Sequence, residues 1–303
     1  MHRFRKILCP VDFSEYSALA LRYASALARE SQAQLLVYHL IPDLTQAISY
    51  LEGNYLGTVN EALAASAGTR TEEFVKNIVP EDQPVSRRIG SGNPSEGILR
   101  TAREESADLI VMGTHGHTGY ERFFIGSVTN RILHKSTIPV LTICKPSHHF
   151  IQDDKDRPVK IERILCALDF DSNNKRIAEL ALSIAREYHS KIRFLHVVPT
   201  KEAEDWEAVE RNANRSFREL VETEKEESCE IQFVVLPGEP GNAILRTIEE
   251  ENIDLLVMGH HTRKPIEELF LGSVAKRMVT DASCPVLVAR STADDIYHDV
   301  TLL

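Results

Sequence analysis

The sequence lacks several features that would place it in a common functional class. No apolar run approaches the roughly 20 residues that a membrane-spanning helix needs, and no apolar signal segment precedes Pro10. The net charge of −10 opposes nonspecific attraction to nucleic acid or to anionic lipid. We therefore expect neither a membrane span nor a nucleic-acid partner.

Cysteine and histidine patterns also give no metal site. The chain has five cysteines and no C-x2-C pair, and Cys9 and Cys166 fall in equivalent apolar runs. This usage favours buried, reduced thiols and a cytoplasmic location. Of the 12 histidines, several are neighbours in loops, but a structural zinc site wants four ligands at defined spacing. We predict solvated loop histidines and no metal ligands.

The two best-known phosphate-binding motifs are missing as well. Neither G-x-x-x-x-G-K-[ST] nor a G-x-G-x-x-G after the first apolar run occurs. Instead, a glycine-rich loop follows residues 108–112 with the spacing Gly113-x2-Gly116-x9-Gly126-Ser127. Glycines let backbone N–H groups turn toward an anion, and the helix expected next adds unpaired donors. Taken singly, each glycine is typical of a turn; together they predict phosphate binding.

Most of the chain occurs twice. Lys6–Phe13 returns as Arg163–Phe170, 157 residues later, and Asp108–Gly113 returns as Asp254–Gly259, 146 residues later. A repeat of this length indicates two domains of ordinary size. We place a first domain at 1–147, a polar linker at 148–160, and a second domain with a C-terminal tail at 161–303.

Each repeat alternates predicted strands and helices. The apolar runs are short, nearly continuous and rich in Ile, Val and Leu, which is typical of strands covered on both faces. In the first repeat we predict strands at Lys6–Asp12, Gln34–Leu40, Val85–Ile89, Asp108–Met112 and Val140–Cys144. We predict helices at Ser14–Glu30, Pro94–Ser106 and Ser127–Lys135. The alternation predicts an α/β fold with a parallel sheet and right-handed crossovers.

Both repeats resemble the universal stress protein family, and the whole chain resembles its tandem two-domain form. The motifs that carry the resemblance are Val11-Asp12, Gly90-Ser-Gly92-Asn-Pro94, Met112-Gly113-Thr-His-Gly116, Gly126-Ser127-Val128 and Pro139-Val140. The resemblance covers residues 4–145 and 162–290. It implies two Rossmann-like domains of the adenine nucleotide α-hydrolase type, each with five parallel strands in the order 3-2-1-4-5. Ligands bind such open sheets at the switch point, here between strands 1 and 4.

The resemblance also implies an ATP site in the first repeat, with glycine and serine at the phosphates, Asp12 at the nucleoside, and the backbone of His39 and Leu40 at adenine. Its residues are Val11, Asp12, His39, Leu40, Gly113, His115, Gly116, Gly126, Ser127 and Val128. Mg²⁺ could accompany the phosphates.

The second repeat departs from this pattern, because Thr262 stands where the middle glycine is expected. If that position needs a positive φ, a β-branched residue is strained there by about 1–3 kcal/mol. Arg263 and Lys264 could offset the strain by contacting phosphate. We expect a lost or weaker second site at Asp169, Gly259, Gly272, Ser273 and Val274.

The resemblance implies a nucleotide-binding stress-response regulator, and the residues themselves identify no catalytic group. No spacing singles out a general base, which leaves only slow ATP hydrolysis open. An adenylating enzyme would carry a glycine pair after strand 1, where this chain has Asp12-Phe-Ser-Glu-Tyr16. A third alternative is a scaffold for a lipid or another apolar ligand, lined by residues 43–71 with Tyr50, Leu51, Tyr55 and Leu56.

The last strand of each repeat, at 139–144 and 285–289, would be an apolar edge in the order 3-2-1-4-5. Apolar edges favour pairing with another edge. We therefore expect the two repeats to pair within one chain as a pseudo-dimer, and we expect the protein to form a homo-oligomer.

Overall fold

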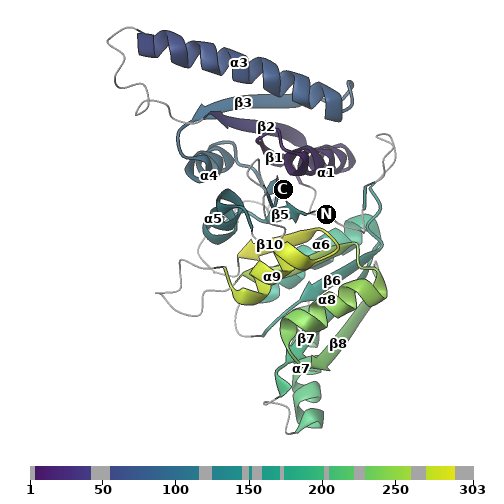
Figure 1. The fold of residues 1–303 in the computed structure, drawn as a ribbon. Coiled ribbons are helices and arrows are strands. Elements are labelled where there is room, and N and C mark those ends of the chain that lie inside the picture. Colours follow the sequence, from purple (N-terminus) through teal and green to yellow (C-terminus); the bar gives the residue numbers. More distant parts are fainter. Residues whose placement is uncertain are drawn as a thin grey trace. The chain divides into compact units, whose positions relative to one another are not determined.

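The computed structural model describes residues 4–41, 55–115, 125–144, 150–151, 159–170, 174–200, 205–221, 229–260 and 271–290. These residues divide into two compact units, one built on strands β1–β5 and the other on β6–β10. Both units alternate strands and helices along the chain (Figure 1). Gly116 and Thr262, which the sequence analysis singled out, lie outside the described residues.

The first unit is an open parallel sheet with the predicted strand order. Its elements are β1 (Lys6–Val11), α1 (Glu15–Ser31), β2 (Gln34–Ile41), α3 (Tyr55–Ile78), β3 (Val85–Ser91), α4 (Pro94–Glu104), β4 (Leu109–Gly113), α5 (Ser127–Lys135) and β5 (Val140–Ile143). Strand β1 pairs in parallel with β2 and β4, β2 also pairs with β3, and β4 with β5. The order is therefore β3-β2-β1-β4-β5, which confirms the expected order 3-2-1-4-5.

The second unit repeats this topology. Its elements are β6 (Arg163–Ala167), α6 (Asn174–Tyr188), β7 (Lys191–Val198), α7 (Trp206–Val221), β8 (Ile231–Pro237), α8 (Pro240–Glu251), β9 (Leu255–His260), α9 (Ser273–Asp281) and β10 (Val286–Arg290). Strand β6 pairs with β7 and β9, β7 with β8, and β9 with β10, all in parallel. In both units the helices pack in matching pairs, α1 with α3 and α4 with α5, α6 with α7 and α8 with α9.

The cores form where the sequence is most apolar. Ile7, Leu8 and Cys9 of β1 are fully buried, as the continuous apolar run predicted. Cys9 and Cys166 are free thiols, and burial raises the pKa of each well above its ordinary value. Buried, protonated thiols agree with the prediction for these two strands.

The local sequence accounts for the helix starts near the carboxyl edge of the first sheet. Ser14 caps α1 by accepting a hydrogen bond from the Ser17 amide at 3.2 Å. Asn93 caps α4 by accepting one from the Glu96 amide at 3.3 Å, and Pro94 occupies the first helical position. Both caps hold helices that border the cavity described below.

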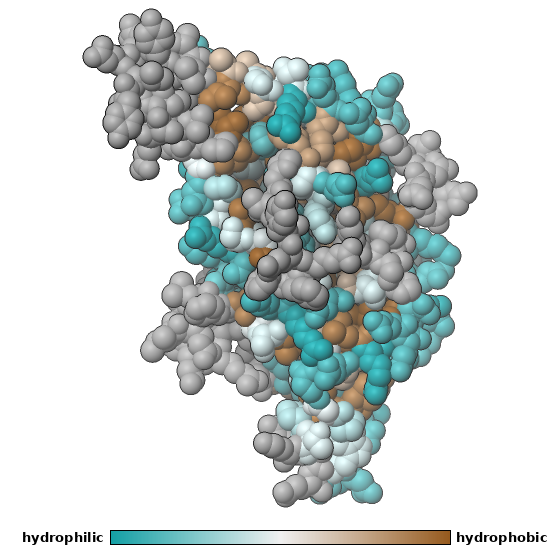
Figure 2. Space-filling view, viewed as in Figure 1, coloured by the Kyte–Doolittle hydropathy of each residue, from teal (hydrophilic) through white to brown (hydrophobic). Residues whose placement is uncertain are grey.

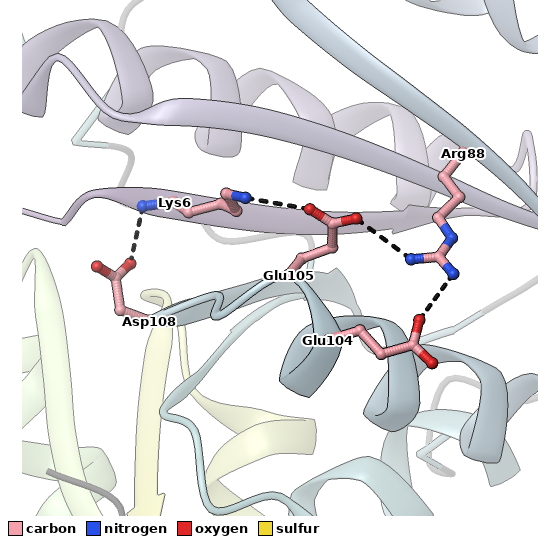
Figure 3. Close-up of polar contacts among 5 residues, drawn as sticks. All are labelled: Lys6, Arg88, Glu104, Glu105 and Asp108. Atoms are coloured by element: carbon pink, nitrogen blue, oxygen red, sulfur yellow. Dashed lines mark hydrogen bonds and ion pairs between the residues drawn. The ribbon is translucent and has the colours of Figure 1, made fainter.

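A cluster of charged side chains joins strands β1 and β3 to the C-terminal end of helix α4 (Figure 3). The Asp108 carboxylate accepts a hydrogen bond from the Lys6 amide at 3.3 Å, and Lys6 Nζ lies 3.1 Å from Glu105. Arg88 of β3 bridges Glu104 at 2.7 Å and Glu105 at 3.2 Å. These side chains are partly exposed, so solvent screens each pair and its contribution to stability is small. The cluster ties β1 and β3 to the end of α4.

Helix α3 was not predicted as such, since residues 43–71 were considered as the lining of an apolar cavity. From residue 55 onward this segment is helical, and it packs on β2, β3 and α1. Ala67, Thr71, Val75 and Ile78 form its buried stripe. Residues 42–54 lie outside the described part of the chain, so the apolar-cavity alternative stays untested.

None of the described helices combines the length and apolar composition needed to cross a membrane. On the face shown in Figure 2, hydrophilic residues are interspersed with smaller hydrophobic areas across the described surface.

Candidate functional site

Asp12 is held rigidly where β1 ends. Its Oδ1 accepts hydrogen bonds from the Ser14 amide at 3.0 Å and from the Ser14 hydroxyl at 2.5 Å. The preceding carbonyl, that of Val11, lies 2.8 Å from Nδ1 of His39 on the neighbouring strand. Because a carbonyl only accepts, Nδ1 carries the proton and donates it. These bonds fix the backbone and the carboxylate at the carboxyl end of β1.

Gly113, which ends β4, admits no side chain. A Cβ atom there would lie 2.8 Å from the Cβ atom of Tyr16 and 2.9 Å from its backbone carbonyl. The ring of Tyr16 packs on His115, with ring centroids 4.9 Å apart. Strand β4 and helix α1 therefore approach each other closely at the mouth of the glycine-rich loop.

The two ends of that loop are tied together. The Gly126 amide donates to the Thr114 carbonyl at 2.8 Å, and the Thr129 hydroxyl donates to the Gly113 carbonyl at 2.9 Å. Gly126 is the N-cap of α5, and no side chain of the described residues caps this helix. The first amides of α5, beginning at Ser127, are therefore offered to another acceptor.

These features surround a cavity of about 260 Å³. Its lining includes most of the residues predicted for the site, namely Val11, Asp12, Leu40, Gly113, His115, Gly126, Ser127 and Val128. They come from the carboxyl ends of β1, β2 and β4 and from the N-terminus of α5. The structure thus brings the predicted residues together at the switch point of the sheet.

The side chain of His39 does not line the cavity, and the contact predicted for its backbone stays a prediction. Side chains alternate along a strand, so Tyr38 and Leu40 face the cavity and His39 faces away from it. The His39 ring packs on Phe13 with centroids 4.3 Å apart. Burial, assisted by the charge of Arg70, lowers the pKa of His39 from its ordinary value. Its role here is to hold the Val11 carbonyl.

Sequence reasoning missed Tyr38, a fully buried side chain in the cavity wall. A Cβ atom on Gly90 would lie 2.7 Å from Cζ of Tyr38, and one on Gly97 would lie 2.7 Å from its hydroxyl. Gly90 and Gly97 therefore make room for the phenol ring. The period-2 pattern around Leu40 and these two glycines are the sequence signals that could have identified it. The cavity lining also includes Pro10, Ser17, Pro94, Ile98, Met112 and Thr129, which were not predicted.

The second domain holds a cavity at the equivalent place, with a volume of about 460 Å³. Four of the residues predicted there, Asp169, Gly259, Ser273 and Val274, line it. Gly272 does not line it and is instead the N-cap of α9, which the described side chains leave without a cap.

Within the described part of the chain, no group of three or more His, Cys, Asp or Glu side chains is placed to hold a metal ion. The first cavity instead offers backbone N–H donors, one fixed carboxylate and apolar walls. Such a set suits a ligand with an anionic end, hydroxyl groups and a flat apolar part.

Comparison with known proteins gives a consistent picture. The model of the universal stress protein family matches residues 3–143 and 160–290. A universal stress protein of Mycolicibacterium smegmatis is 25% identical over 301 residues, which cover 94% of this chain and 96% of the relative. The universal stress protein MJ0577 of Methanocaldococcus jannaschii is 29% identical over 153 residues, covering 46% of this chain and 94% of its own. A solved universal stress protein from Archaeoglobus fulgidus shares the fold with a TM-score of 0.71 at 20% identity, covering 96% of this chain and 100% of that one.

Proposed function

Because the chain belongs to the universal stress protein family, we propose that its first domain binds ATP and that the protein acts as an ATP-gated regulator of a stress response. The observation that carries the proposal is the cavity of the first domain. It places the loop glycines, the uncapped start of α5 and the Asp12 carboxylate around one space at the switch point.

In this proposal, different residues around the cavity bind different parts of ATP. The amides of Ser127 and Val128 and the Ser127 hydroxyl bind phosphate oxygens, because the N-terminus of a helix favours anions. The Asp12 carboxylate accepts hydrogen bonds from the ribose hydroxyls. The flat base packs in the apolar part of the cavity beside Leu40. That Mg²⁺ accompanies the phosphates stays a prediction from the sequence.

ATP would act here as a bound signal. Phosphates held at Gly113 and at the start of α5 link the two ends of the glycine-rich loop, and binding stabilises the arrangement that makes these contacts. No spacing in the sequence singles out a general base for hydrolysis. We propose that the protein does this in the cytoplasm, as a homo-oligomer, and that hydrolysis is slow or absent.

Calorimetric titration of the intact protein with ATP tests the proposal. We expect about one ATP per chain, and weaker binding after Ser127→Ala because that change removes a hydroxyl contact at the helix N-terminus. The matched control is Ser273→Ala, the same change at the same position of the second domain, which should leave ATP affinity unchanged. Absence of ATP binding, or two equal sites per chain, would contradict the proposal. An apolar ligand retained through purification and identified by mass spectrometry would favour the scaffold alternative.

A further inference from the structure

Tyr38 lies at one end of the cavity of the first domain, and the start of α5 lies at the other. Tyr38 and Leu40 line the cavity from β2, whereas Gly113 and Ser127 line it from the end of β4 and the start of α5. Strand β1 lies between β2 and β4 in the sheet, which separates the two ends by about 10 Å, twice the usual spacing of strands. If ATP binds with its phosphates at α5, as proposed above, its base therefore lies at the β2 end, beside Tyr38.

The Tyr38 ring fills space that two glycines leave open. Gly90 of β3 is paired in register with Leu40, so a side chain at this position would point to the same face of the sheet. A Cβ atom on Gly90 would lie 2.7 Å from Cζ of Tyr38 and 3.0 Å from Cε2, and one on Gly97 of α4 would lie 2.7 Å from the hydroxyl. The ring is only 2% exposed. Because it packs against backbone at both glycines, it has no room to swing aside for a larger ligand.

The second domain builds the same part of its cavity wall without an aromatic ring. Leu195 stands where the first domain has Tyr38. Leu236 and Ala243 stand where it has the two glycines. Leu195 lines a cavity of about 460 Å³, whereas Tyr38 lines one of about 260 Å³. The smaller cavity therefore belongs to the domain with the larger side chain at this position of the wall.

We propose that Tyr38 determines which bases the first site accepts, because its ring limits the size of the base at the edge farthest from the ribose. A purine is joined to ribose through its five-membered ring, and its 6-amino group projects from the opposite end. With the ribose at Asp12 and the phosphates at α5, that end of the base meets the Tyr38 ring. The site takes adenine nucleotides with a free 6-amino group and rejects those that carry a bulky group on that nitrogen. This inference rests on the ATP binding proposed for the first domain.

The test is calorimetric titration of the full chain with ATP and with N6-benzyl-ATP. The wild-type protein should bind ATP more tightly than the analogue by about tenfold or more, since even one methylene in excess of a pocket changes binding that much. Tyr38→Leu leaves the space beside Gly90 and Gly97 open. The affinity of this variant for the analogue should therefore rise by about tenfold or more, without a similar rise for ATP.

Two controls separate a loss of selectivity from a loss of stability. Tyr38→Phe keeps the ring and should keep rejecting the analogue. Tyr23→Leu makes the same change at a tyrosine that is also fully buried but lies in α1 and does not line the cavity, so the ratio of the two affinities should not change. Tyr38→Met is a second variant in case Tyr38→Leu does not fold, because the unbranched methionine side chain adapts to irregular space.

The affinity for the analogue decides the proposal. Similar affinities of the wild-type protein for ATP and N6-benzyl-ATP would overturn it, and so would rejection of the analogue by folded Tyr38→Leu or Tyr38→Met protein. Neither result contradicts the proposed function, because the wild-type protein still binds ATP in both. If the wild-type protein binds no ATP, the proposed function itself is wrong, and the specificity role of Tyr38 is wrong with it.

Discussion

Gly113 and the Tyr16 backbone are in such close contact that a Cβ atom on the glycine would lie 2.9 Å from the Tyr16 carbonyl carbon. For the corresponding glycine of the second domain, Gly259, the nearest atom of the described residues to an added Cβ atom is 3.5 Å away, in the side chain of Ile177. Tyr16 also packs on His115 beside the first cavity. The first domain therefore depends on glycine at this strand end, whereas the described residues around Gly259 leave room for a methyl group.

The two glycines predict responses of different size to the same change. Gly113→Ala should destabilise the first domain by about 1–3 kcal/mol, because backbone atoms must move to admit the methyl group. Gly259→Ala should change the stability of the second domain by less than about 1 kcal/mol, since the methyl group meets only ordinary contacts with the described residues. Calorimetric unfolding of the full chain measures both. Equal losses for the two variants would contradict the close contact at Tyr16.

Tyr38 and Gly90 predict an energetic coupling. Gly90→Ala alone should be destabilising because its methyl group would overlap the Tyr38 ring. In a Tyr38→Leu background, which copies Leu195 of the second domain, the same change should cost less. A double-mutant cycle by urea unfolding should give a coupling energy of about 0.5–3 kcal/mol, the usual range for residues in contact. Additive effects would show that the ring adapts without cost.

The sequence was sufficient to predict the fold of each domain. Every strand of the first repeat was predicted to within about two residues at each end, because continuous Ile, Val and Leu runs between helix caps leave little choice. The two-domain reading followed from the repeated runs at Lys6 and Arg163. Helix α3 was not predicted because its buried stripe of Ala67, Thr71 and Val75 is only weakly apolar.

Several details of the site could not be predicted from the sequence. The left-handed backbone at Phe13 and Phe170, with φ of 67° and 60°, has no sequence signature, because bulky residues rarely adopt it. Tertiary packing stabilises both, since Phe13 packs on His39 and Phe170 packs on His196 at 4.6 Å. The Arg277 guanidinium donates a hydrogen bond to the Glu239 carboxylate, 38 positions earlier in the chain. No local sequence pattern indicates such a contact.

His39 predicts a pH dependence of stability. Burial and the charge of Arg70 lower its pKa in the folded state, whereas the unfolded chain has the ordinary value of about 6.5. The unfolded state therefore binds the proton more readily, and the free energy of unfolding falls as the pH drops below about 6.5. His39→Asn should remove this part of the decline. Unfolding curves of both proteins from pH 7.5 to about 5 would measure the difference, and parallel profiles would contradict the assignment.

The expected pairing of the two domains through their apolar edge strands stays a prediction. A paired chain of 303 residues should have a radius of gyration of about 19 Å, the value for a compact chain of this length. Two domains tethered without contact would be clearly larger. Small-angle scattering of the dilute protein measures this dimension. A value well above about 25 Å, for particles whose scattering mass is that of a single chain, would show that the domains do not pair.

If ATP is a bound signal and not a consumed substrate, then binding alone should stabilise the first domain. Ligand at 100 times its dissociation constant stabilises a protein by about 2.7 kcal/mol. For a domain of ordinary size this raises the melting temperature by several degrees. A non-hydrolysable analogue should produce the same shift as ATP, and Ser127→Ala should reduce both shifts together. Differential scanning calorimetry measures the shifts, and a phosphate-release assay runs in parallel. Turnover above about 1 per second, which is the lower end for ordinary enzymes, would favour an ATPase and contradict the regulator.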